Sequence, residues 1–98
     1  MIAEAAGRLA AAAPQAQVFL CGSHARGNAG PDSDLDFLVV EPTVDDPVEE
    51  SVRLRRALRD LDLFADVVVV SEHEVQRWRD VHGTLIHSAL SEGRLLAA

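Results

Sequence analysis

Lysine is absent from this sequence, and cysteine and aromatic residues are scarce. All nine basic residues are arginine against 16 acidic residues, so the 98-residue chain has a formal net charge of −7. Affinity for nucleic acid comes largely from basic side chains that neutralise phosphates, and base stacking needs more than the single Trp78. We therefore expect no general nucleic-acid binding. The acidic balance fits a bound cation, a basic protein partner or simply an acidic surface.

Two further absences limit the class of protein. Cys21 is the only cysteine, which excludes an internal disulfide. No apolar run reaches the ~20 residues of a membrane-spanning helix. The Ala-rich residues 9–13 resemble part of a signal peptide, but they are too few, and Glu4 occupies the place of a basic region. We expect a soluble, cytoplasmic protein with no membrane partner.

What remains is the pattern of a small packed domain. The length fits one domain, residues 1–98, and 48% of the residues are apolar. Helical spacing alternates along the chain with short β-branched runs, an order that predicts an α/β domain. The expected helices are 2–13, 23–26, 45–62, 71–82 and 84–92, and the expected strands are 18–21, 34–41 and 64–70.

Several local contacts are expected within these elements. Ser71 and Glu74 have the spacing of a capping box. Glu49 and Arg53 are four residues apart, which favours an ion pair along the helix. The arginines at 53, 55, 56 and 59 are expected to be its solvent-exposed face. Apolar side chains expected to anchor the last helices on the core are Val75, Trp78, Val81 and Leu85.

A glycine and a serine follow the first predicted strand. Gly22 and Ser23 stand at the start of a short predicted helix, where unpaired backbone N–H groups and the helix dipole favour a phosphate. Glycine lets the phosphate come close to the backbone, and the Ser23 hydroxyl adds a donor. The spacing from Gly22 to Gly27 also fits a P-loop, but Asn28 and Ala29 replace its Lys and Ser/Thr, so we set that motif aside.

Three carboxylates form the second half of the candidate site. Asp34 and Asp36 are two apart on a predicted strand, so they point to the same face, where their repulsion favours Mg²⁺ between them. Asp66 is embedded in an apolar strand and completes a three-carboxylate site if that strand neighbours 34–40. The alternative is a polar entry to the strand for the first two, and an edge-facing charge for Asp66.

The remaining reactive side chains carry weaker patterns. Cys21 is expected to be a small buried residue at a strand end, and the four histidines are expected at the surface or at helix ends. His73 and Glu74 begin a zinc-protease pattern, but residue 77 is arginine, so that reading fails. His24 lies in the expected nucleotide loop, and its role stays open.

The run Gly22-Ser-His-Ala-Arg-Gly27, followed by Asp32-Ser-Asp-Leu-Asp36, resembles the signature of the DNA polymerase β-type nucleotidyltransferases, and in particular their minimal nucleotidyltransferase (MNT) branch. The resemblance extends to the later Asp66 and implies a small mixed β-sheet flanked by helices. It implies that Gly22 and Ser23 bind the triphosphate and that Arg26 lies near its phosphates, with a surface salt bridge as the alternative role of Arg26. It also implies that Asp34, Asp36 and Asp66 hold two Mg²⁺ ions, with Mn²⁺ as an alternative, and that Asp66 helps activate the attacking hydroxyl.

The same resemblance implies a partner. Members of the MNT branch are typically antitoxins that transfer AMP from ATP to a HEPN-domain ribonuclease toxin. Two rival functions stay open: an antitoxin that neutralises its partner by binding alone, and a nucleotidyltransferase that modifies a small molecule such as an antibiotic. The acceptor, the nucleotide base, the choice between Mg²⁺ and Mn²⁺ and the stoichiometry are not defined by the sequence.

Overall fold

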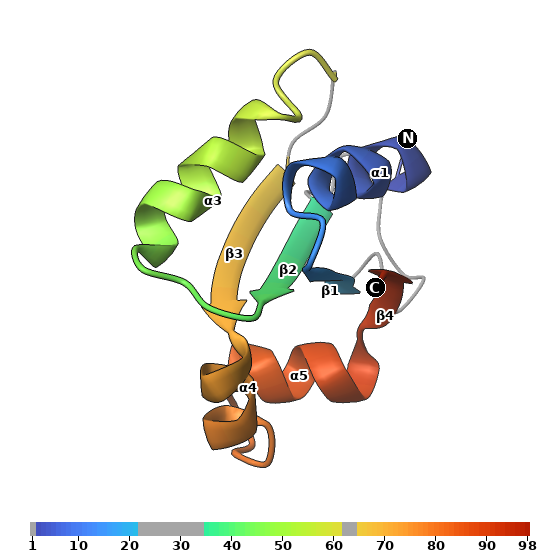
Figure 1. Cartoon of the computed structure of the whole chain (residues 1–98). Coiled ribbons are helices and arrows are strands. Elements are labelled where there is room, and N and C mark those ends of the chain that lie inside the picture. The colour runs from blue at the N-terminus through green and yellow to red at the C-terminus, as the bar shows by residue number, and fades with distance from the viewer. Residues whose placement is uncertain (1, 22–34, 62–64) are drawn as a thin grey trace.

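The computed structural model of the chain describes residues 2–21, 35–61 and 65–98, in which a four-stranded sheet is packed against helices (Figure 1). This confirms the expected α/β fold with a small mixed sheet. In chain order the elements are α1 (Ile2–Ala12), β1 (Gln17–Cys21), β2 (Leu35–Glu41), α3 (Pro47–Arg56), β3 (Ala65–Ser71), α4 (Glu72–Trp78), α5 (Leu85–Glu92) and β4 (Arg94–Ala97).

The strand order in the sheet is β3-β2-β1-β4. β1 runs antiparallel to both of its neighbours, whereas β2 and β3 are parallel. Parallel neighbours need a crossover connection, and α3 supplies it. The two strands joined by this crossover therefore begin at the same end of the sheet (Figure 1).

Alternation of side chains along the strands divides the core in two. Phe37 and Val39 point to the face covered by α1 and α3, where they pack with Leu9 and Leu54. Leu38, Val40 and Val70 point to the other face and pack with Ile86 and Ala89 of α5. Odd-numbered positions of β2 thus belong to the α1/α3 face, and even-numbered positions to the α5 face.

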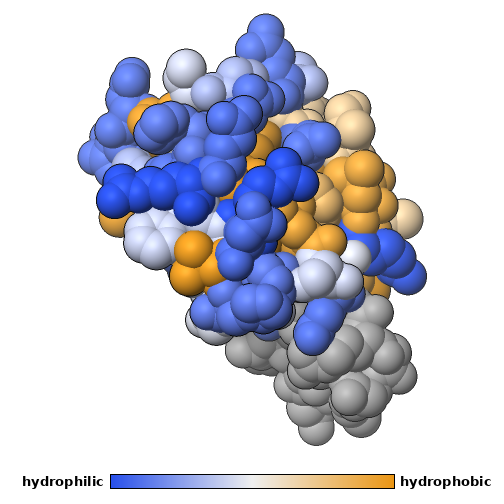
Figure 2. Space-filling model, turned by 90° about the horizontal axis from the view of Figure 1, so that it is seen from below, coloured by the Kyte–Doolittle hydropathy of each residue, from blue (hydrophilic) through white to orange (hydrophobic). Residues whose placement is uncertain are grey.

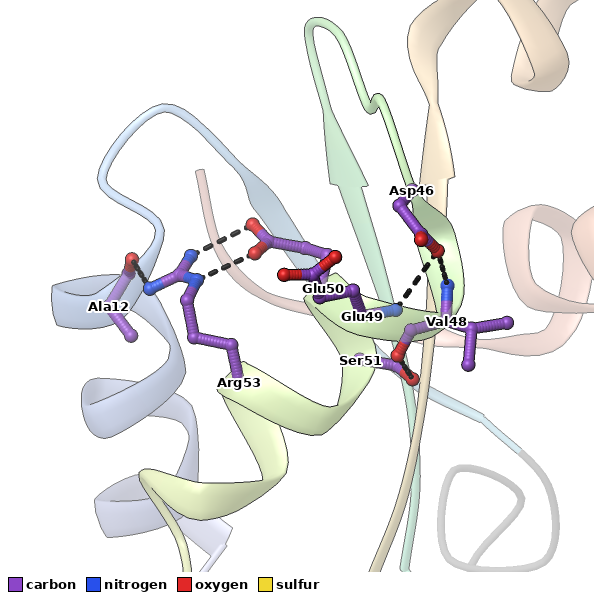
Figure 3. Close-up of polar contacts among 7 residues, drawn as sticks. All are labelled: Ala12, Asp46, Val48, Glu49, Glu50, Ser51 and Arg53. Carbon is purple, nitrogen blue, oxygen red and sulfur yellow. Dashed lines mark hydrogen bonds and ion pairs between the residues drawn. The ribbon is translucent and has the colours of Figure 1, made fainter.

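Side-chain caps define where the helices begin. The Asp46 carboxylate accepts hydrogen bonds from the Val48 and Glu49 amides, both at 3.1 Å (Figure 3). Ser71 caps α4, as expected, by accepting from the Glu74 amide at 3.2 Å. The helix expected over 45–62 is shorter, because single turns replace it after Arg56. Within the described ranges no helix is long and apolar enough to cross a membrane.

The C-terminal strand β4 was not expected from the sequence. It pairs with β1, and the pairing register shifts between Val18 and Phe19. β4 has only four residues, too few for alternation to predict a strand, so its pairing with β1 is what explains it. Leu95 stays 49% exposed on this edge of the sheet.

The expected anchoring of the last helices is largely wrong. Val75 packs partly against the α5 core, but Trp78, Val81 and Leu85 are 37%, 41% and 44% exposed. Arg77 instead lies over the Trp78 ring, with its guanidinium carbon 5.2 Å from the ring centroid. Figure 2 shows the end of the molecule that carries α4 and α5, where apolar side chains emerge among hydrophilic ones.

Candidate active site

One end of the sheet gathers four strand termini, one of which is the start of β4 at Arg94. β2 begins there at Leu35, β3 begins there at Ala65, and the antiparallel β1 ends there at Cys21. This end lies at the top of the sheet in Figure 1, where the arrows for β2 and β3 start. Residues near these termini are brought together although they are far apart in sequence.

The strand register places Asp36 and Asp66 directly beside each other. Asp36 of β2 pairs with Asp66 of β3, and on its other side with Cys21 of β1. Neighbouring strands lie roughly 4.8 Å apart, so side chains in one row of a sheet are close neighbours. Both carboxylates share the parity of Leu38 and Val70, which places them on the α5 face. We call this set the Cys21–Asp36–Asp66 row.

Burial differs along this row. Cys21 is buried, Asp36 is half-buried and Asp66 is exposed on the edge strand. Burial raises the pKa of the Cys21 thiol to about 11, and the negative charge of Asp36 adds to that shift. The thiol therefore stays protonated at neutral pH. Cys21 is the small buried residue that was expected, and not a thiolate nucleophile.

The chemistry of the two carboxylates fits a hard divalent cation. Mg²⁺ prefers oxygen ligands and is commonly held by one or two carboxylates together with substrate phosphates. Two carboxylates side by side on one face repel each other, and a cation removes that repulsion. Among the residues that the structure describes, no group of three potential ligands is close enough to hold an ion. Asp36 and Asp66 could thus supply two ligands of the expected three.

The remaining predicted site residues belong to the part of the chain that the structure does not describe. Gly22, Ser23, Arg26 and Asp34 lie outside the described residues, as does His24. Their segment, 22–34, connects the end of β1 to the start of β2, and both of these strand ends belong to the same end of the sheet as Asp36.

Comparison with protein families decides the identity of the fold. The family model described as "Nucleotidyltransferase domain" matches residues 2–96, nearly the whole chain. The chain belongs to the nucleotidyltransferase domain family. No curated protein matches it.

Solved structures share the fold of this nucleotidyltransferase domain at low sequence identity. A chain in a crystal structure of a toxin–antitoxin with AMP-PNP superposes with a TM-score of 0.69 and 20% identity, over 98% of this chain and 73% of that one. A chain of a mutant MntA–HpeT toxin–antitoxin gives 0.65 and 20%, over 92% and 67%. A protein from Sulfolobus solfataricus, described as a nucleotidyltransferase, gives 0.64 and 22%, over 96% and 74%.

A second carboxylate pair lies at the opposite end of β2 and was missed in the sequence. Glu41 ends that strand, and Glu50 lies on α3. Burial raises the pKa of Glu41 to about 7, and the hydrogen bond with Glu50 and its charge add to the shift. The pKa of Glu50 is lowered to about 2, mainly by Arg53. Below about pH 7 Glu41 is therefore mostly protonated, whereas Glu50 stays ionised beside Arg53.

Arg53 completes this second cluster. Its guanidinium donates to both Glu50 carboxylate oxygens at 2.6 and 2.8 Å, and to the Ala12 carbonyl of α1 at 2.9 Å (Figure 3). The predicted pair with Glu49 is wrong, because Arg53 pairs instead with Glu50, three residues before it. A signal existed in the sequence: Glu41 ends an apolar strand, as Asp66 interrupts one.

Proposed function

We propose that this nucleotidyltransferase transfers AMP from ATP to a hydroxyl group on a protein partner, and that the partner is a HEPN-domain toxin. The observation that carries the proposal is the in-register neighbourhood of Asp36 and Asp66 on one face of the sheet. With Asp34 they would hold the metal ions, and the proposed phosphate-binding residues are Gly22, Ser23 and Arg26.

The position of each carboxylate suits a separate task. Asp36 is half-buried in the middle of the row and would hold the nucleotide-bound metal. Asp66 is exposed on an edge strand, where an acceptor hydroxyl can reach it and give up its proton. When bound, Mg²⁺ would lower the pKa of the attacking hydroxyl and neutralise charge on the departing pyrophosphate. Gly22 and Ser23 would orient the triphosphate by hydrogen bonds.

Two structural relatives support the choice of nucleotide and partner. The toxin–antitoxin that superposes on 98% of this chain was crystallised with AMP-PNP, an analogue of ATP. The second relative is also a toxin–antitoxin. The net charge of −7 further favours a basic partner, since complementary charges steer association.

Mass spectrometry of the partner tests the proposal. A purified HEPN-domain toxin would be incubated with the purified chain, ATP and Mg²⁺, and its intact mass measured. We expect a mass increase of one or more AMP units, which Asp36→Ala abolishes. Neutralisation of the toxin without any adduct would favour the binding-only antitoxin. An unmodified toxin, together with AMP transfer to an aminoglycoside, would favour the small-molecule enzyme.

A further inference from the structure

One face of α3 carries an exposed stripe of mixed character. Val48, Val52, Arg55, Arg56 and Arg59 follow each other at helical spacing, on the side away from the buried Leu54 and Leu58; we call them the α3 stripe. Val48 is 73% exposed and Val52 39%, although both are apolar. A shallow groove of about 370 Å³ is lined by the last four of these residues, Val52, Arg55, Arg56 and Arg59.

The arginines of the stripe differ from others in the described chain. Arg8 pairs with Glu4 and Asp60, and Arg53 pairs with Glu50. By contrast, no carboxylate among the described residues forms an ion pair with Arg55, Arg56 or Arg59. Three cationic groups are thus concentrated at the C-terminal end of α3 and in the turn that follows it, in a protein whose net charge is −7. Positive charge kept together in this way favours a negatively charged ligand.

We infer that the α3 stripe is the docking surface for the acceptor protein, and that it binds a local acidic patch with an apolar centre on a partner that is basic overall. This inference rests on the proposed function, which supplies the partner. The two exposed valines decide between the classes of ligand, because nucleic-acid phosphates gain nothing from them, whereas a protein ridge buries them. Arginine is also enriched among the residues that dominate the binding energy of protein interfaces.

The stripe lies away from the proposed chemistry. α3 packs on the sheet face of Phe37 and Val39, whereas Asp36 and Asp66 share the opposite face. The stripe points outward from α3, so a partner bound there leaves the carboxylate pair uncovered. Docking should therefore affect how tightly the acceptor binds, and leave nucleotide binding and the chemical step unchanged.

Charge reversal of the stripe tests this separation. In the variant Arg55→Glu with Arg59→Glu, we expect the Kd for the HEPN-domain protein to rise at least about tenfold and its KM as an acceptor to rise in parallel. The KM for ATP and kcat should stay at the parental values. The matched control is Arg77→Glu with Arg79→Glu, which makes the same change in net charge on exposed positions of the α4 end. Equal weakening by both variants would overturn the inference.

A second variant separates a protein ligand from a nucleic acid. Val48→Ser with Val52→Ser keeps the charge and changes only exposed side chains, so its melting temperature should match the parent. We expect a several-fold weaker affinity for the HEPN-domain protein. An RNA oligonucleotide that binds more tightly than the protein, depends on Arg55 and Arg59 and ignores the valines would overturn the inference in favour of a nucleic-acid surface.

The two proposals fail in distinguishable ways. A toxin that receives AMP with unchanged KM from the charge-reversed chain would contradict the docking surface alone. A toxin that the parental chain neither binds nor modifies would contradict the proposed function, and the docking inference with it. Adduct formation by the parental chain, with a raised acceptor KM only in the stripe variants, supports both.

Discussion

The two ends of β2 each place a pair of carboxylates side by side, but they treat the charge differently. At the end of the strand, the raised pKa of Glu41 favours its neutral form, and two hydrogen bonds from Arg53 neutralise Glu50. At its start, Asp36 and Asp66 are register partners, and Asp66 is exposed. There the negative charge of Asp36 contributes to the raised pKa of the neighbouring Cys21.

This difference separates a structural cluster from a candidate site. Arg53 ties Glu50 to the Ala12 carbonyl, so the first cluster connects α1 and α3. The Asp36–Asp66 pair lies instead at the start of β2 and β3, with Asp66 exposed on the edge strand and the polar segment 22–34 attached at the same end of the sheet. Proximity of two acids is therefore not sufficient evidence for a metal site. At the Glu41–Glu50 pair Arg53 supplies the neutralising charge, so a cation has no task there.

The largest expected effect is at Asp66. Asp66→Asn is nearly isosteric and exposed, so the fold should survive, whereas the rate of AMP transfer should fall by at least about 100-fold, the scale of losing one electrostatic contact in a transition state. Binding of ATP with Mg²⁺ should persist through Asp34 and Asp36. The check is single-turnover transfer followed by intact mass. A parental rate in Asp66→Asn would reduce Asp66 to an edge-facing charge.

A smaller effect is expected at the other cluster. Arg53→Ala removes the hydrogen bonds to Glu50 and to the Ala12 carbonyl, and should lower the free energy of unfolding by roughly 1–2 kcal/mol. Activity of the folded protein should be unchanged. Urea unfolding with a transfer assay in parallel measures both quantities. Arg79→Ala, at an exposed position outside the cluster, is the control. Loss of activity with unchanged stability in Arg53→Ala would mean that the Glu41–Glu50–Arg53 cluster contributes to AMP transfer.

The smallest effect is a dependence of stability on pH. The pKa of Glu41 rises from 4.5 unfolded to about 7 folded, so its stabilising contribution is complete below pH 4.5 and is lost as pH rises through 7. Because the pKa of Glu50 is lowered, its contribution to the free energy of unfolding is present above pH 4.5 and is lost as the pH falls toward about 2. Glu41→Gln should abolish the decline between about pH 4.5 and 7. Parallel curves of unfolding free energy against pH for the parent and the variant would contradict the raised pKa of Glu41.

Much of this arrangement could be predicted from short-range patterns. The alternation of Asp34, Leu35 and Asp36 predicts that the two acids share a face, and the β-branched run after Asp66 predicts its strand. Their register, Asp36 beside Asp66, could not be predicted, because it depends on how α3 returns the chain. The structure describes only Asp36 and Asp66 of the expected site residues.

Errors arose where contacts are long-range or cross an element boundary. Arg53 pairs with Glu50 and not with Glu49, and its guanidinium also donates to the Ala12 carbonyl, which is 41 residues away in the sequence. His82 and His87 are five residues apart, a spacing that does not share one helix face, yet their ring centroids are 4.2 Å apart, because His82 precedes α5 and is not held to helical spacing. Trp78 is partly exposed, since it ends a helix of only seven residues whose apolar side chains cannot all reach the core.

The most direct test compares the two ends of β2 by calorimetric titration with ATP. Parental protein should bind ATP in the presence of Mg²⁺ and lose that binding in EDTA. Asp36→Asn with Asp66→Asn should abolish the Mg²⁺-dependent binding, whereas Glu41→Gln with Glu50→Gln should leave it at parental strength. Equal ATP binding with and without Mg²⁺, or loss of binding only in the Glu41 and Glu50 variant, would contradict the assignment of the metal–nucleotide site to the start of β2.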